Sequence, residues 1–265
     1  MSLPAYPPGA GRRLVFLHLP KTGGTTLHHH FSAFFRPEEI CPSTGPDLHL
    51  IPPERLAAYR YFAGHFVYDQ LRLITGPLFT VTVLRPPVER LLSAYYFLRR
   101  HGAERLARHP LPEASIARAS ANLLDFLRNP DPRVQYTVSN VMARALAGGV
   151  NVAADGGYVL AAAGVGIAIS ELEVMHRATG NLLAMDVVGF NSNLAQVYAR
   201  VALAFGMPRL VDLARLNTRN QAVPGLEPVV EEEITPEARA ELQRLTTLDR
   251  EIFRLARAHA ALARR

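Results

Sequence analysis

The sequence of 265 residues contains a single cysteine, Cys41, so it cannot form an internal disulfide bond or the Cys/His patterns of structural zinc sites. It also lacks a run of about 18 apolar residues, the length needed to cross a bilayer. Residues 1–11 are rich in proline and glycine and lack the apolar segment of a signal peptide. We therefore expect a protein without a membrane span, in a reducing compartment such as the cytoplasm, with a flexible segment at residues 1–11.

Acidic residues are in deficit, with 23 Asp and Glu against 29 Lys and Arg, and the formal net charge is +6. This balance favours anionic ligands but does not distinguish a nucleotide from a nucleic acid or an acidic glycan. Since the sequence has no nucleic-acid-binding motif, we expect no nucleic-acid partner. The hydrophobic content of 49% is that of a globular protein, and the length allows a single domain over residues 1–265.

The stretch Leu14–Leu27 is the most informative part of the sequence. It opens with an apolar run, continues with glycine and threonine, and ends where apolar residues recur on one helix face, at Leu27, Phe31, Phe34 and Phe35. This order predicts a strand, a loop and a helix that begins near Thr25. The first N–H groups of a helix lack acceptors and its dipole makes that end positive, so the pattern predicts a phosphate or sulfate site.

The loop supplies further groups that suit an anion. Lys21 brings a positive charge, Gly23 and Gly24 let a ligand approach the backbone, and three hydroxyls add donors, those of Thr22, Thr25 and Thr26. A Walker A loop has its lysine after the last glycine, whereas Lys21 precedes both glycines, so this is not a standard NTPase loop. A glycine-threonine turn with an incidental lysine is the plain alternative.

A second strand and helix follow the same plan. Residues Leu78–Leu84 are apolar and β-branched enough for a buried strand, and Arg85-Pro86-Pro87 ends it. Proline suits the first turn of a helix, so a helix is expected from this point. Arg85 at the strand end and Ser93 in the helix are then candidates to bind one anion together.

The two stretches together resemble the carbohydrate sulfotransferases, in particular the heparan sulfate 2-O-sulfotransferase-like enzymes. Residues 16–26 are similar to the loop that holds the 5′ end of 3′-phosphoadenosine 5′-phosphosulfate (PAPS), and residues 84–96 are similar to the 3′-phosphate motif. Pro86 stands where the family usually has aspartate. The resemblance implies an α/β fold with a central, mostly parallel sheet flanked by helices, as in P-loop NTPases. The function that it implies is in-line transfer of a sulfuryl group from PAPS to a hydroxyl of a carbohydrate or glycolipid, without a metal ion.

The resemblance also implies roles for individual residues. Lys21 would stabilise the leaving oxygen, and His65, in the Gly-His pair that ends a short strand from Tyr61, would be the catalytic base. Ala63 replaces a second histidine of the related enzymes. Arg219 either closes over the nucleotide or lies on the surface. The reserve candidates for the base are Glu54, Asp69 and His18.

Partners and location follow from the same comparison. Eukaryotic relatives are usually anchored in the Golgi, whereas this sequence has no apolar run long enough to cross a bilayer. We therefore expect a cytoplasmic enzyme or one held at a membrane by a partner. The basic run Arg99–Arg108 either binds an acidic carbohydrate or is a solvated face. Two other functions stay open, a nucleotide or sugar kinase that needs Mg²⁺ and a nucleotide-binding module without catalysis.

Three further segments lead to structural expectations. Thr235 and Pro236 start a helical pattern that continues to Leu255 and predicts one long amphipathic helix, with a homo-oligomer contact as the alternative role of its apolar stripe. Asn140 and Arg144 lie one helical turn apart and serve either structure or substrate. Residues 151–166 are rich in small side chains and are expected to be a buried segment or a loop.

Overall fold

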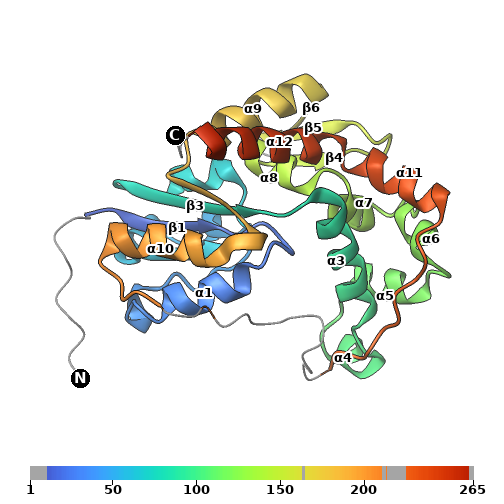
Figure 1. Cartoon of the computed structure of the whole chain (residues 1–265), viewed down its shortest axis with the longest axis horizontal. Coiled ribbons are helices and arrows are strands. Elements are labelled where there is room, and N and C mark those ends of the chain that lie inside the picture. The colour runs from blue at the N-terminus through green and yellow to red at the C-terminus, as the bar shows by residue number, and fades with distance from the viewer. Residues whose placement is uncertain (1–10, 163–164, 211–212, 214–224, 263–265) are drawn as a thin grey trace. The chain divides into compact units, whose positions relative to one another are not determined.

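The computed structural model describes residues 11–162, 165–210, 213 and 225–262 (Figure 1). Contacts within the chain define two compact units, one of Met1–Leu84 with Gly180–Leu216 and one of Arg85–Thr179 with Asn217–Arg265. Within the described residues, we find no helix with both the length and the apolar character that a membrane crossing requires. Each unit is described by itself below, and the single domain over residues 1–265 stays a prediction.

The first unit is built on a sheet of four parallel strands in the order β2-β1-β3-β7. The strands are β1 (Arg13–Leu17), β2 (Tyr61–Gly64), β3 (Leu78–Leu84) and β7 (Val187–Phe190). Successive residues of β1 are buried on opposite faces of the sheet, which is why the strand reads as an unbroken apolar run. The predicted strand–loop–helix order and the parallel α/β sheet flanked by helices are confirmed.

Two helices share the core on one face of this sheet, α1 (Gly24–Ser32) and α10 (Leu194–Phe205). Helix α1 begins at Gly24 and ends before Phe34 and Phe35, which follow in a turn and still pack against the same core. Helix α10 ends at Gly206, whose φ of 65° is the left-handed conformation of a C-cap. The remaining elements of this unit are α2 (Pro53–Ala58) and the 3₁₀ helices η1 (Pro37–Glu39), η2 (Leu48–Leu50), η3 (Tyr68–Leu73) and η4 (Asn191–Asn193).

Because the four strands are parallel, their carboxyl ends meet at one edge of the sheet. The loop with Lys21 follows β1 at this edge, His65 follows β2, and η4 follows β7. Arg85 is the next residue of the chain after β3. The sheet topology therefore gathers the predicted 5′-phosphosulfate loop and the predicted base.

The second unit is mainly helical and also holds a small antiparallel sheet. Its helices are α3 (Pro87–Arg99), α4 (Ala103–Arg108), α5 (Pro112–Ala119), α6 (Leu123–Leu127), α7 (Pro132–Val138) and α8 (Val141–Ala147), with α9 (Glu171–Leu183) leading back to the first unit. The sheet has the order β4-β5-β6, with β4 (Val150–Val152), β5 (Tyr158–Ala162) and β6 (Val165–Ile169). The expectation of a buried segment or loop for residues 151–166 was wrong, because strands rich in alanine and glycine lack the β-branched alternation that marks a strand.

The predicted long C-terminal helix is also wrong, because it is two helices, α11 (Pro236–Leu245) and α12 (Thr247–Leu262). Asn140 explains the break. Its N–H donates to the carbonyl of Leu245 (2.8 Å), and its Oδ1 accepts from the N–H groups of Leu248 (2.8 Å) and Asp249 (3.2 Å). The buried side chain of Asn140 thus caps the start of α12, and its backbone N–H satisfies the end of α11.

Arg144, like Asn140, is buried and bonded to the backbone of the protein. Its guanidinium donates to the carbonyls of Ser139 (2.7 Å), Val150 (3.1 Å) and Tyr136. Of the two roles left open for Asn140 and Arg144, the structure thus supports hydrogen bonding within the fold, since both side chains are inaccessible.

We expect Asn140→Ala to lower the free energy of unfolding by about 1–3 kcal/mol, because it leaves the N–H groups of α12 uncapped and places alanine at a φ of 43°. Asn140→Gly should lose less than the alanine variant, since glycine adopts this φ without strain. Urea unfolding measures both, and Asn151→Ala, at an exposed position of β4, is the control. Equal stability of Asn140→Ala and wild type would contradict the capping role.

Candidate functional site

The loop between β1 and α1 is held in shape by its own hydrogen bonds. Thr22 is fully buried, and its hydroxyl donates to the carbonyl of Leu19 (2.8 Å), so this hydroxyl is engaged within the loop. Lys21 adopts a φ of 68° and Gly23 a φ of 94°, both left-handed. A left-handed lysine is uncommon, and a rare backbone conformation of this kind is found where the surrounding structure determines it. The loop therefore holds the backbone of Lys21 in one conformation.

Helix α1 presents its amino terminus at the end of this loop. Gly23, at the N-cap, has no side chain to cap the helix, and the first turn, residues 24–27, has no acidic residue. Backbone N–H groups and the positive helix end are then the features that an anion would meet, next to the ammonium group of Lys21. Of the two threonines in this turn, Thr25 is exposed and Thr26 is buried. This terminus is suited to a phosphate or sulfate group.

The structure gives each of the two glycines a reason within the protein. A Cβ atom on Gly24 would lie 2.0 Å from Cδ2 of His18, so the ring of His18 occupies the space of a side chain. A Cβ atom on Gly23 would lie 3.2 Å from Cδ1 of Leu194, at the start of α10. The sequence argument assigned both glycines to close approach of a ligand. The structure gives the ring of His18 as the reason for Gly24 and the left-handed φ of 94° as the reason for Gly23.

His18 and His65 lie side by side at the carboxyl edge of the sheet. Leu17 of β1 pairs with Gly64 of β2, and the next residue of each strand is a histidine. The two ring centroids are 4.6 Å apart. Nδ1 of His65 lies 2.7 Å from the carbonyl oxygen of His18, and a carbonyl only accepts, so Nδ1 carries the proton. The lone pair of a neutral His65 is then on Nε2.

The protein holds both histidines toward their neutral forms. Burial, followed by the nearby His65, His28 and Lys21, lowers the pKa of His18 to about 3. Partial removal of water lowers the pKa of His65, and Lys21 lowers it further, against the opposing effect of the hydrogen bond to His18. Although part of the ring of His65 is shielded, the residue as a whole is exposed. His65 is thus a neutral base that a ligand can reach, whereas His18 is too weak a base at neutral pH.

The other reserve bases are less well placed in the first unit. Glu54 lies in α2, which precedes β2 and is therefore at the amino ends of the strands, away from the Lys21 loop. Asp69 lies in η3, after β2, and is half-buried. His18 is the candidate for which the described structure shows a direct contact with His65.

The predicted 3′-phosphate residues belong to the second unit. Helix α3 begins at Pro87, as the sequence predicts, and carries Ser93, which is half-buried. Arg85 is half-buried, and its Nε lies 3.7 Å from a carboxylate oxygen of Glu89. Arg219 lies outside the described residues. The assignment of Arg85, Ser93 and Arg219 to a nucleotide stays a prediction.

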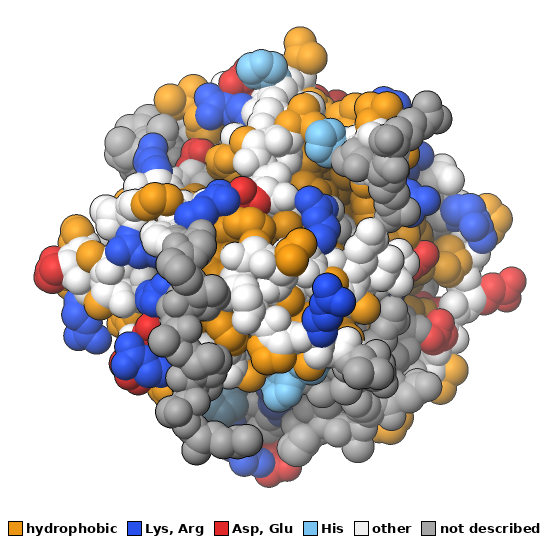
Figure 2. Space-filling model, turned by 60° about the vertical axis from the view of Figure 1, so that its left-hand side comes forward, with side chains coloured by type: hydrophobic (Ala, Val, Ile, Leu, Met, Phe, Trp, Pro, Cys, Tyr) orange, Lys and Arg blue, Asp and Glu red, His pale blue; other side chains and the backbone are white. Residues whose placement is uncertain are grey.

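Arginines of the basic run largely have partners inside the second unit. Arg99 pairs with Glu232 (2.8 Å), Arg108 pairs with Glu104, and Arg100 donates to the carbonyl of Glu227 (3.3 Å). On the face shown in Figure 2, Lys and Arg side chains lie among hydrophobic and other side chains, several of them on the left of the view. These pairs favour the interpretation of the run as a solvated face over an acidic-substrate site.

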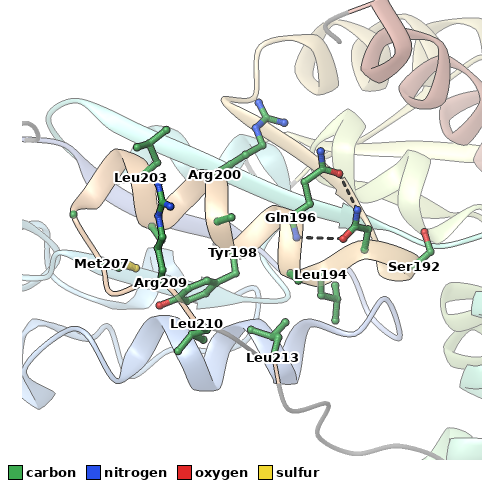
Figure 3. Close-up of a pocket in the computed structure, with 15 residues that line it drawn as sticks. Ser192, Leu194, Gln196, Tyr198, Arg200, Leu203, Met207, Arg209, Leu210 and Leu213 are labelled. Atoms are coloured by element: carbon green, nitrogen blue, oxygen red, sulfur yellow. Dashed lines mark hydrogen bonds between the residues drawn. The ribbon is translucent and has the colours of Figure 1, made fainter.

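A pocket of about 790 Å³ surrounds α10 and the residues after it (Figure 3). Neither Lys21 nor His65 lines it. Its walls are mainly apolar, with Tyr198, Met207 and Leu210, and the arginines Arg200 and Arg209 at the rim. It touches the predicted site at Leu194, the residue that packs on Gly23. The motifs gave no signal for Leu194, because its contact joins segments about 170 residues apart.

The described residues include no group of three or more His, Cys, Asp and Glu side chains that could hold a metal ion. The chemistry of the loop, the helix end and His65 is that of binding an anion and accepting a proton. With a parallel sheet flanked by helices, these features are consistent with a sulfotransferase-like α/β protein.

Comparison with known proteins supports this class. Over 104 residues, the chain is 34% identical to a protein-tyrosine sulfotransferase of Arabidopsis thaliana. The match covers 38% of this chain and spans about 20% of the relative's length. No family model matches the chain. The similarity supports a relationship to sulfotransferases in general, and it does not support the heparan sulfate 2-O-sulfotransferase-like subfamily in particular.

Because the pKa of His18 is lowered in the folded protein, we expect the stability of the protein to depend on pH. In the unfolded chain, His18 has a pKa of 6.5 and binds a proton below that pH, whereas in the folded protein its pKa is about 3. His18 therefore makes its full contribution to the free energy of unfolding above pH 6.5. This contribution falls as the pH decreases toward 3. Urea unfolding at a series of pH values should show the stability difference between wild type and His18→Asn shrinking as the pH decreases.

Other groups titrate in the same range, so the comparison needs a matched variant. His49 is exposed in η2, and His49→Asn is the matched variant that removes a histidine from the surface. A constant difference for His18→Asn would show that His18 is not held neutral by the fold.

Proposed function

We propose that this protein is an enzyme that transfers a sulfuryl group from PAPS to a hydroxyl group. The observation that carries the proposal is the loop with Lys21, which leads into the uncapped amino terminus of α1 beside His65. The similarity to a protein-tyrosine sulfotransferase supports the same class of reaction. PAPS supplies an activated sulfuryl group and the stable leaving group adenosine 3′,5′-bisphosphate.

The residues that would hold PAPS are divided between its two ends. Lys21, the backbone N–H groups of residues 22–26 and the hydroxyl of the exposed Thr25 suit the 5′ end, and the buried Thr26 is assigned to it on the sequence motif. Thr22 contributes its backbone, because its hydroxyl is bonded to Leu19. Arg85 and Ser93 are assigned to the 3′-phosphate on their sequence motif, and Arg219 is proposed to close over the nucleotide on the same ground.

Lys21 and His65 would then do the chemistry that the protein itself contributes. The ammonium of Lys21 and the positive end of α1 stabilise negative charge on an oxygen bound at the loop. His65 accepts the proton of the attacking hydroxyl at Nε2, because Nδ1 is occupied by its own proton. A lysine and a helix end place positive charge where kinases use a magnesium ion, so the proposed reaction needs no metal.

Two classes of molecule are candidates for the acceptor of the sulfuryl group. The resemblance of the two motifs to carbohydrate sulfotransferases favours a hydroxyl of a carbohydrate or glycolipid. The name of the relative favours a tyrosine hydroxyl in a protein. A phenol loses its proton far more readily than a sugar hydroxyl, so a tyrosine acceptor would depend less on His65.

The test is transfer of radiolabelled sulfate from PAPS to a panel of neutral glycans, acidic glycans and tyrosine-containing peptides. Lys21→Ala should lower the rate on the best acceptor about 10²-fold or more, because it removes charge stabilisation at the leaving oxygen. Arg72→Ala removes one exposed positive charge from η3 in the same unit and should leave the rate unchanged.

Two outcomes would contradict the proposal. One is no transfer to any acceptor with intact binding of adenosine 3′,5′-bisphosphate, which favours a nucleotide-binding module, and the other is magnesium-dependent ATP turnover, which favours a kinase. Binding can be followed at Lys21 itself, the only lysine in the sequence. Bound bisphosphate should slow the reaction of this amine with a lysine-selective reagent.

A separate prediction tests the assignment of the 3′-phosphate. Arg85→Ala and Ser93→Ala should each weaken binding of adenosine 3′,5′-bisphosphate more than binding of AMP, which lacks the 3′-phosphate. Loss of a charge-assisted hydrogen bond costs about 1.5–3 kcal/mol, so Arg85→Ala should have the larger effect. Calorimetric titration measures both nucleotides, with Arg239→Ala on the exposed side of α11 as the matched control. Equal losses for the two nucleotides would remove Arg85 and Ser93 from the site.

A further inference from the structure

We infer that His18 is a positioning residue for His65: its carbonyl fixes the tautomer of His65 so that Nε2 is the atom that accepts a proton, and its ring holds that carbonyl in place. The catalytic part of this inference rests on the proposed function. The tautomer itself does not, because it is a property of the protein without any ligand.

The first step is the register of the sheet. Leu17 pairs with Gly64, and the N–H of His18 donates to the carbonyl of Gly64 (3.0 Å), so both histidines leave the sheet from neighbouring strands at the same level. A shift of one residue between β1 and β2 would direct the two side chains to opposite faces. The pairing of the strands thus sets the distance between the two residues.

The second step is the anchoring of His65 at two points. Its backbone N–H donates to the carbonyl of Thr44 (2.8 Å), and its Nδ1–H donates to the carbonyl of His18 (2.7 Å). A Cβ atom at Gly64 would lie 2.7 Å from the carbonyl oxygen of Thr44, so the backbone at Thr44 packs directly on the strand end. The partner of one ring nitrogen determines the role of the other, and a carbonyl at Nδ1 leaves Nε2 as the base.

The third step is the position of the ring of His18. It stacks on the ring of Phe16, with centroids 5.4 Å apart and planes at 11°, and its other neighbours are the ring of His65 and the Cα of Gly24. The ring is therefore enclosed by β1, by His65 and by the start of α1. An enclosed ring restricts the backbone of its own residue, which includes the carbonyl that binds His65.

The charge of the neighbours favours the same arrangement. Lys21 is the charged side chain that acts on the pKa of His65, and the ring of His18 lies beside the ring of His65. Burial keeps His18 neutral, so it adds no second positive charge beside His65 when His65 is protonated. On proton transfer, the O–H bond of the acceptor breaks and an N–H bond forms at Nε2. The Nδ1–H bond to the carbonyl of His18 then becomes charge-assisted and stronger, and the proton later passes to solvent.

The test is nitrogen-15 NMR of the labelled protein without nucleotide, at a pH where histidines are neutral. Two-bond correlations from the ring carbons distinguish a protonated from an unprotonated ring nitrogen, and the His65→Ala variant assigns the signals of His65. We expect a protonated Nδ1 and an unprotonated Nε2. A protonated Nε2, or an average of the two tautomers, would overturn the inference whether or not the protein transfers sulfate.

Variants of His18 test the role of its ring. His18→Ala should bring His65 toward a mixture of tautomers and lower kcat about 10- to 100-fold with little change in the KM for PAPS, because the base is misplaced. Water that enters the vacated space should raise the pKa of His65 and move the acid limb of the pH–rate profile to higher pH. His18→Phe keeps an enclosed ring and should retain the tautomer and the acid limb.

The control and the outcomes keep this inference separate from the proposed function. His49→Ala removes an exposed histidine of η2 and should leave the signals of His65 and the rate unchanged. If His65 shows the expected tautomer but no acceptor is sulfated, the proposed function fails and the positioning of His65 stands. If His18→Ala keeps the tautomer, the rate and the acid limb of wild type, the ring of His18 has no positioning role.

Discussion

The parallel pairing of β1 with β2 is the constraint on which the candidate site depends. It places His18 beside His65, and the turn that follows His18 determines where α1 begins. The ring of His18 lies on Gly24, the first residue of α1, so the proposed base and the proposed anion site touch the same side chain. A change in this register would therefore alter both sites together, whereas changes at the helical surface would leave them intact.

The second unit is held together by a different kind of interaction, a group of buried polar side chains. Arg90 of α3 is fully buried and lies 4.0 Å from Asp249 of α12, also fully buried. Burial lowers the pKa of Arg90 to about 10, opposed by Asp249, and raises the pKa of Asp249, opposed by Arg90. Removing one partner of such a pair typically costs about 3–5 kcal/mol, because the other charge is left buried without compensation. Helix α3, which carries Ser93, is therefore fixed from within its own unit.

The sequence predicted the local structure around the candidate site and missed the contacts between distant segments. The strand, the Lys21 loop and the start of α1 were correct because one continuous stretch contains the whole signal, and the same holds for β3 and α3. The break between α11 and α12 could not be foreseen, since Asn140 lies more than 100 residues before the helices it caps. The role of Gly24 was missed for a similar reason, because His18 fills a space that the sequence pattern left for a ligand. His65 was selected by resemblance alone, and the sequence held no signal for its hydrogen bond to His18.

The lysine and arginine content of the chain supports a specific role for Lys21. The sequence has 29 Lys and Arg residues, of which Lys21 is the only lysine. Arginine serves a structural role at positions such as Arg144, whose planar group donates hydrogen bonds to three carbonyls at once. A lysine instead presents a compact charge on a flexible stem, which can follow an oxygen as negative charge develops on it. The one position where the chain departs from arginine is thus a loop with a left-handed backbone at a helix amino terminus, where a point charge is more useful than a fork of donors.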